Sequence, residues 1–214
     1  MIRKTKIIAT IGPSTAKKGI LRKIIQKGVN VCRLNFSHLS HEDAKTIISL
    51  IKTINQELNV HTAILADLQG PKIRVGEIEK PISLNKGDEL VLSTKKQNKN
   101  YLFVSYKDFA RDIGAGENIL IDDGKIKLKV LKSNGVDTVT TKVIVPNVLS
   151  SNKGINLPNT NVSLPCLTKK DRKDLKFVLN EKIEWVALSF VRKAQDLIDL
   201  RKILKRNKSK VGVI

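Results

Sequence analysis

Three polar side chains alternate with apolar ones in the segment NVCRLNFSHLSHE, residues 30–42. Arg33, Asn35 and Ser37 occupy every second position, and a strand points every second side chain to one face. Arginine offers forked donors that suit phosphate or carboxylate, while amide and hydroxyl oxygens suit alkali and alkaline-earth cations. Asp67, at the end of a later apolar run, adds a carboxylate. Phosphoryl transfer needs an anion-binding site beside a cation-binding site, because positioning and charge stabilise its transition state. The alternative is an Arg33–Asp67 ion pair that only fills the interior.

The elements that would carry these residues alternate between strand and helix. Apolar runs at 6–12, 30–36 and 62–68 predict three buried strands. Helical patterns lie between them, so the strands are expected to be parallel and joined by helical crossovers.

Cap residues mark the predicted helix starts. Ser14 or Thr15 is expected to cap the first helix, and Ser40, with Asp43 three residues later, the second. Apolar residues recur at helical spacing after each cap, at Ile20, Leu21, Ile24 and Ile25 and then at Ala44, Ile47, Ile48, Ile51, Ile54 and Leu58.

From residue 70 to 165 the segments are short and alternate in polarity, with Asp-Gly and Asn-Gly turns between them, which predicts an inserted all-β domain. The alternation of helix and strand patterns resumes near residue 168. Thr168 and Asp171 form a second capping pair there, and a strand is predicted at 185–190. A last helix, with Ala194, Leu197, Ile198 and Leu204 on its apolar face, precedes the strand begun by KVGVI.

Five parallel strands fit either an open doubly wound sheet or part of a (β/α)8 barrel. Polar residues that face the interior favour the barrel, where functional side chains lie at the carboxyl ends of the strands. The predicted fold class is therefore α/β, a partial (β/α)8 TIM barrel of about five of eight strands with an inserted small all-β barrel. The barrel domain would comprise residues 1–69 and 166–214, and the inserted domain residues 70–165.

Two further segments carry cations near glycine. ADLQGPKIRVG contains Arg74, and SSNKGINLP places Lys153 beside Gly154, where a lysine can approach phosphate oxygens. Taken alone, Lys153 fits a surface turn better. The chain contains no GxxxxGK[ST] motif, which excludes a Walker-type phosphate cradle.

The formal net charge is +20, from 40 Lys and Arg against 20 Asp and Glu, so anions are the expected partners. The lysines are scattered and aromatic residues are only 4%, which argues against nucleic-acid binding.

The two cysteines, Cys32 and Cys166, have no CxxC spacing, so no disulfide or metal site is predicted, and both are expected to be reduced and buried. No long apolar run and no leader are present, so we expect neither a membrane span nor export, but a cytoplasmic protein.

Several long segments, in order, resemble the hallmark segments of pyruvate kinases. They are TKIIATIGPST, NVCRLNFSHLSHE, ADLQGPKIRVG, SSNKGINLP and LTKKDRKDLKF with WVALSFVRKAQDL. The resemblance implies a TIM barrel with a small β domain after its third strand. It also implies the glycolytic transfer of phosphate from phosphoenolpyruvate to ADP, giving pyruvate and ATP, with Mg²⁺ and usually K⁺. Family members are homo-oligomers.

The resemblance also implies residue roles. Arg33 would grip the substrate phosphate. K⁺ would be held by Asn35, Ser37, Asp67 and the Leu68 carbonyl. The nucleotide would be contacted by Asn35, His38, Arg74 and Lys153, with Thr10 and Pro13 lining the same pocket. The alternative for His38 is a polar turn residue beside a helix start. His41 and His61 are expected at the surface.

Two departures from the family pattern matter. Leu39 stands where the family has glycine, and a positive φ there would strain a leucine. In the family, the strand begun by KVGVI continues into an Ala-Lys-Ile-Glu-like stretch with the catalytic lysine and the first Mg²⁺ ligand, which this sequence does not contain. We therefore expect no retained catalytic residue, and a chain that is inactive and poorly stable alone. A non-catalytic remnant and a basic anion- or nucleic-acid-binding protein are the alternatives.

Overall fold

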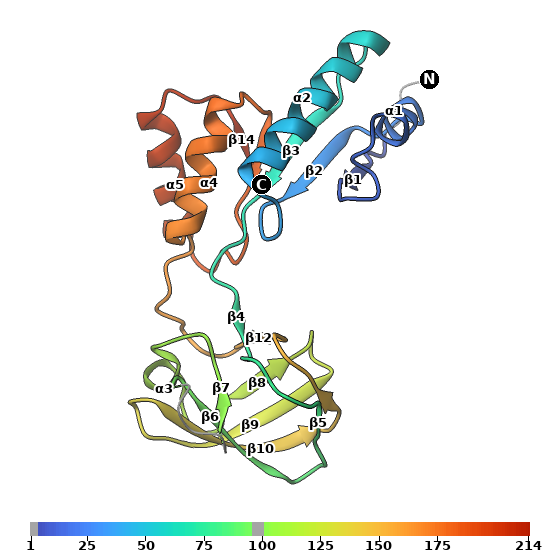
Figure 1. The fold of residues 1–214 in the computed structure, drawn as a ribbon. Coiled ribbons are helices and arrows are strands. Elements are labelled where there is room, and N and C mark those ends of the chain that lie inside the picture. Colours follow the sequence, from blue (N-terminus) through green and yellow to red (C-terminus); the bar gives the residue numbers. More distant parts are fainter. Residues whose placement is uncertain (1–3, 96–100) are drawn as a thin grey trace. The chain divides into compact units, whose positions relative to one another are not determined.

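The computed structural model describes residues 4–95 and 101–214, which form two compact units (Figure 1). The barrel unit comprises Met1–Pro71 and Pro165–Ile214, and the β unit comprises Lys72–Leu164.

The barrel unit contains a five-stranded sheet in which every strand pair is parallel. Its strands, in spatial order, are β1 (Ile8–Thr10), β2 (Val31–Asn35), β3 (Ala63–Asp67), β13 (Trp185–Ala187) and β14 (Gly212–Val213). The spatial order equals the chain order, whereas a doubly wound sheet reverses its order at a switch point. The prediction of a partial (β/α)8 barrel rather than an open sheet is confirmed.

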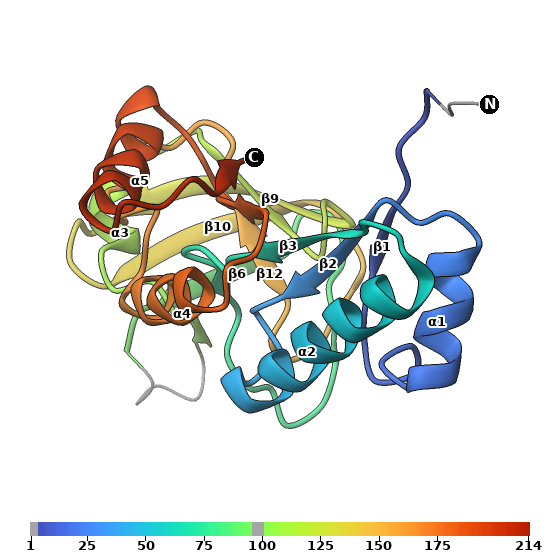
Figure 2. The same ribbon diagram turned by 90° about the horizontal axis from the view of Figure 1, so that it is seen from above.

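Helices line one side of this sheet in an arc, seen from above in Figure 2. They are α1 (Lys18–Gln26), α2 (His41–Leu58), α4 (Lys169–Asn180) and α5 (Ala194–Arg206). Their buried apolar side chains form one core with the strands, including Leu21, Ile25, Ala44, Ile47, Ile48, Ile51, Ile54, Leu175, Val178, Leu200 and Leu204. No helix in the described ranges is long and apolar enough to cross a membrane.

The predicted caps have different outcomes. Ser40 caps α2 as expected, because its Oγ accepts the backbone N–H of Asp43 at 3.1 Å. The prediction for α1 is wrong: the residue before its first turn is Lys17. Thr15 instead closes the turn before the helix, where its Oγ1 accepts the backbone N–H of Gly12 at 2.9 Å.

The predicted apolar face of α5 is also partly wrong. Ala194 is exposed and Ile198 is 44% exposed, whereas Leu200 and Leu204 are buried. The buried residues are one turn apart, so the helix presents that face to the core and turns Ile198 away from it.

Asp171 is fully buried and holds two chain segments together. Its Oδ2 accepts the backbone N–H of Thr168 at 2.9 Å, which completes the predicted capping box of α4. Its Oδ1 accepts the backbone N–H of Gly70 at 3.1 Å, 101 residues earlier in the chain. One carboxylate therefore fixes the barrel-unit residues just before and just after the β unit in sequence.

We expect Asp171→Asn to lower the free energy of unfolding by about 2 kcal/mol, because an amide cannot accept all of these bonds. Trp185, the single tryptophan of the chain, lies in β13, so its fluorescence during urea denaturation reports on the barrel unit. Asp199→Asn, on the exposed face of α5, is the matched control. Equal stability of the two variants would contradict the role of Asp171.

Cys32 and Cys166 are both buried free thiols, and desolvation raises the pKa of each to about 11. The reactive thiolate is therefore scarce at neutral pH. We expect iodoacetamide at pH 8 to label neither cysteine in the folded chain and both after denaturation. Rapid labelling of the folded chain, read by mass spectrometry, would contradict this burial.

The β unit is built around a seven-stranded sheet, in the spatial order β4 (Ile73–Arg74), β12 (Gly154–Asn156), β8 (Asn118–Ile121), β9 (Ile126–Ser133), β10 (Thr138–Val145), β6 (Glu89–Ser93) and β7 (Leu102–Phe103). Two further short strands, β5 (Ile82–Ser83) and β11 (Val148–Leu149), pair with each other in a separate antiparallel sheet. Val75 bridges Val104, and the N–H of Gly76 donates to the Phe103 carbonyl at 2.8 Å. These contacts join the first and last strands, so the sheet closes into a small barrel.

The expectation that this unit is all-β is not fully met, because it contains the short helix α3 (Phe109–Asp112). Phe109 and Ala110 are buried in the core of the unit. A single helical turn is too short to produce the apolar periodicity by which a helix is recognised in sequence.

Candidate functional site

Strand β2 separates its side chains as the alternation predicts. Cys32 and Leu34, with Phe36 just after the strand, are fully buried. Arg33 and Asn35 lie half-buried on the opposite face. The face away from the helices therefore carries the polar residues, and it is the interior face of a (β/α)8 barrel.

Arg33 and Asp67 form the centre of this face. The Nε of Arg33 donates to Asp67 Oδ2 at 2.9 Å and its Nη2 donates to the same oxygen at 2.5 Å. Its Nη1 donates to Thr10 Oγ1 at 2.8 Å. The ion pair left open by the sequence is thus present, but the Arg33 side chain is 33% exposed. These contacts use three of the five guanidinium N–H groups, which leaves donors for an anion.

Ser189 is a member of this group that the sequence analysis did not identify. It follows β13, and its Oγ donates to Asp67 Oδ1 at 3.0 Å. Both oxygens of the Asp67 carboxylate are therefore engaged. The available signal was its place in the segment WVALSF, at the carboxyl end of a strand beside β3.

Asn35 and Ser37 lie at the carboxyl end of β2. Asn35 is opposite Asp67 in the parallel ladder of β2 and β3. The Oδ1 of Asn35 accepts the backbone N–H of Ser37 at 3.0 Å, and the Phe36 N–H donates to the Asp67 carbonyl at 3.0 Å. The amide of Asn35 thus fixes the first residue of the loop that follows the strand.

A cavity of about 520 Å³ opens beside these residues. Four predicted nucleotide-pocket residues line it together, namely Thr10, Pro13, Asn35 and His38. The remaining lining residues come from the segment before α1, from the loop before α2 and from the first half of α2, and they are Ile11, Gly12, Ala16, Leu39, Asp43, Thr46 and Ile47. Its volume is within the range of small-molecule sites, which are mostly apolar with a few polar groups. Thr10 connects the cavity to Arg33.

The expected strain at Leu39 is absent. Leu39 is not among the residues with positive φ in the described part of the chain. It is partly buried and packs against the core of the barrel unit. A leucine is therefore accommodated beside His38, whose side chain is exposed at the rim of the cavity. His41 and His61 are exposed as expected.

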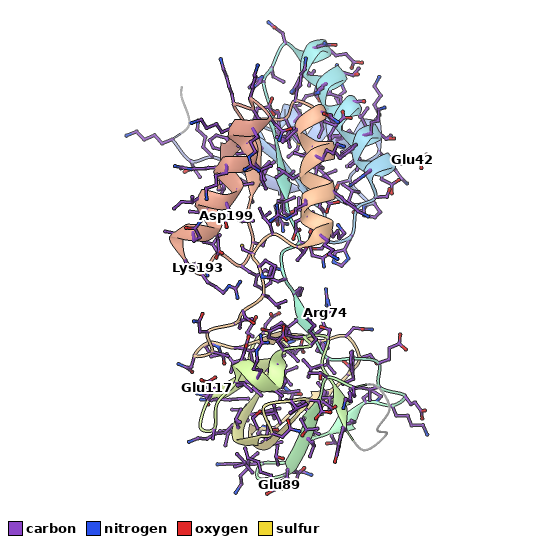
Figure 3. The ribbon with its side chains drawn as sticks, turned by 90° about the vertical axis from the view of Figure 1, so that its left-hand side faces the viewer. Glu42, Arg74, Glu89, Glu117, Lys193 and Asp199 are labelled. Atoms are coloured by element: carbon purple, nitrogen blue, oxygen red, sulfur yellow. The ribbon has the colours of Figure 1, made fainter. Side chains whose placement is uncertain are left out.

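Arg74 and Lys153 are neighbours within the β unit. Arg74, labelled in Figure 3, lies on β4 opposite Gly154 of β12. Its Nη1 donates to the Asn152 carbonyl at 2.9 Å. The Nζ of Lys153 lies 3.1 Å from Asp122 Oδ1, and this hydrogen bond lowers the pKa of Asp122. Arg74 on β4 and Lys153, directly before β12, are thus brought together by the pairing of these two strands.

The groups on the polar face of the barrel-unit sheet that could bind a cation are all oxygen atoms. Among residues 4–95 and 101–214, no group of three or more His, Cys, Asp or Glu side chains could hold a metal ion. Asn35, Ser37, Asp67 and the Leu68 carbonyl supply oxygens of four chemical kinds. Oxygen donors of this kind are the ligands of hard cations, whereas transition metals favour nitrogen and sulfur donors.

The sequence was compared with protein-family models and with known proteins. The family model described as "Pyruvate kinase, barrel domain" matches residues 2–214. The pyruvate kinase of Buchnera aphidicola subsp. Acyrthosiphon pisum is 41% identical over all of this chain and 45% of its own length. Pyruvate kinase 2 of Synechocystis sp. is 42% identical over 99% of this chain and 37% of its own. The pyruvate kinase of Clostridium perfringens is 41% identical over 95% of this chain and 44% of its own.

The chain thus spans less than half the length of these curated relatives. The match nevertheless extends through both units and includes the segments that carry Arg33, Asn35, Asp67 and Lys153. This chain belongs to the pyruvate kinase family.

Proposed function

We propose that this chain is part of a phosphotransferase that moves a phosphoryl group from phosphoenolpyruvate to ADP and so gives pyruvate and ATP. The observation that carries the proposal is the cavity lined by Thr10, Pro13, Asn35 and His38, which Thr10 joins to the Arg33–Asp67 pair. A cavity in the size range of small-molecule sites, beside a partly exposed guanidinium, suits the binding of two phosphate compounds.

Arg33 would grip the substrate phosphate through its remaining N–H groups. Asp67 holds the guanidinium in one orientation by a two-point contact, so little side-chain freedom is lost when an anion binds.

K⁺ would be held by Asn35, Ser37, Asp67 and the Leu68 carbonyl, whose oxygen donors fit it. When bound, it would add positive charge beside the transferred phosphate. Mg²⁺, the second ion that the family resemblance implies, is expected to take its acidic ligands from outside these 214 residues. The residues of this chain would then bind and orient the substrates.

Nucleotide contacts are proposed for both units, each on its own residues. In the barrel unit, His38 and Asn35 line the cavity. In the β unit, Arg74 and Lys153 are the proposed phosphate contacts, and Lys153 would exchange Asp122 for phosphate oxygens. Phosphate binding by lysine beside a glycine is favoured because the backbone leaves room for the anion. We propose a cytoplasmic enzyme, consistent with two free thiols.

Titration of ADP into the purified chain by calorimetry tests the proposal. We expect His38→Ala, Arg74→Ala and Lys153→Ala each to weaken ADP binding about tenfold, because each removes a polar or charged hydrogen bond to the nucleotide. His61→Ala and Lys173→Ala, at exposed positions, are the matched controls. Equal affinity in all variants, with a steep loss of binding in salt, would instead identify a non-specific anion binder.

A further inference from the structure

Asp174 of α4 is a buried carboxylate that a lysine and a histidine approach from different elements. Its side chain is only 5% exposed. The Nε2 of His41, the first residue of α2, lies 2.8 Å from Asp174 Oδ1. The Nζ of Lys170 lies 2.6 Å from Asp174 Oδ2. We call Asp174, Lys170 and His41 the Asp174 cluster.

The cluster also holds the end of strand β2. The Nζ of Lys170 donates to the backbone carbonyl of Phe36 at 2.5 Å. Phe36 is fully buried and directly precedes Ser37 and His38. Lys170 is thus oriented by Asp174 while it fixes the carbonyl from which the loop starts.

Aromatic packing fixes the other end of the same loop. The ring of His41 stacks on Phe177 of α4, with centroids 4.5 Å apart and planes 5° from parallel. The Phe36 and Phe177 rings lie 6.2 Å apart in a tilted arrangement. Residues on both sides of the segment 37–40 are therefore anchored to one helix, α4.

We propose that Lys170 and Asp174 are positioning residues that hold the segment Ser37–Leu39 at the cavity. This inference rests on the proposed function, in which Ser37 and His38 bind the cation and the nucleotide. Within residues 4–95 and 101–214, the hydrogen bonds of Lys170 and Asp174 join them to Phe36, His41 and each other, and none of these residues lines the cavity. The cluster acts through the backbone of Phe36 and would leave the strand itself in place.

Amide hydrogen exchange by NMR tests the proposal directly. The N–H of Ser37 donates to Asn35 Oδ1, and the N–H of His38 donates to the Asn35 carbonyl at 3.3 Å, so both amides report on the loop. In Lys170→Met we expect exchange at Ser37 and His38 to rise about tenfold, the factor that losing one charge-assisted hydrogen bond gives. Exchange in β2 should stay unchanged. Lys173→Met, exposed on the same helix, is the matched control.

The single variant leaves the buried Asp174 carboxylate without its lysine, which could destabilise the fold. The double variant Lys170→Met/Asp174→Asn controls for this, because it also removes that carboxylate charge. We expect the same faster exchange at Ser37 and His38 in the double variant. Unchanged exchange at both amides in the two variants would overturn the inference. ADP affinity is measured on the same samples. If the unaltered chain binds no ADP, the proposed function fails, while the exchange data still decide whether Lys170 positions the loop.

Discussion

The purified chain of residues 1–214 is expected to form no pyruvate from phosphoenolpyruvate and ADP above the background of its Arg33→Ala variant. The chain belongs to the pyruvate kinase family but spans only 37–45% of the length of the three relatives named above. The family's lysine for the migrating phosphoryl group and its acidic Mg²⁺ ligands are expected outside this sequence. Each lost electrostatic stabiliser costs about 3 kcal/mol of barrier or more. The combined loss would reduce turnover below detection.

A lactate dehydrogenase-coupled assay makes the measurement, with a full-length relative such as the Buchnera enzyme as positive control. Turnover that scales with the concentration of this chain and disappears in Arg33→Ala would contradict the prediction. It would mean that residues 1–214 supply the missing charges themselves.

Replacing Asp67 with alanine is expected to lower the free energy of unfolding of the barrel unit by about 2–3 kcal/mol, because the substitution leaves partners unpaired. The Asp67 side chain is 15% exposed and accepts bonds from Arg33 and Ser189. Arg33 would keep its charge in a partly desolvated position without a partner. Urea denaturation followed by Trp185 fluorescence measures the change.

A double-mutant cycle isolates the pair. In Arg33→Met/Asp67→Ala the loss should be smaller than the sum of the two single losses by about 1 kcal/mol or more, because contacting residues do not act additively. Asp199→Ala, whose side chain is 51% exposed, controls for removal of a surface carboxylate. Additive losses would show that Arg33 and Asp67 contribute independently, contrary to the contact geometry.

The sequence predicted the parts of the site that depend on local periodicity. Alternation along β2 decides which side chains share a face, so Arg33 and Asn35 were correctly opposed to Cys32 and Leu34. The order of the parallel strands follows from helical crossovers of one hand, so Asn35 and Asp67 were correctly expected near each other.

Contacts between distant segments could not be predicted in this way. Ser189 meets Asp67 across 122 residues, and Lys170 meets Phe36 across 134 residues. Both contacts depend on how α4 and β13 pack, which periodicity does not specify. The predicted cap of α1 was wrong for a local reason, because the Thr15 hydroxyl bonds to the backbone of Gly12 instead of to the first turn of the helix.

NMR titration of the ¹⁵N-labelled chain with ADP tests the central claim most directly, that the cavity beside Arg33 and Asp67 binds the nucleotide. The expected result is saturable movement of the amide signals of Gly12, Asn35 and His38, which persists at 150 mM salt and which tripolyphosphate does not reproduce in the cavity residues. Shifts spread over exposed lysines such as Lys129 and Lys176, equal for ADP and tripolyphosphate and lost in salt, would contradict the claim.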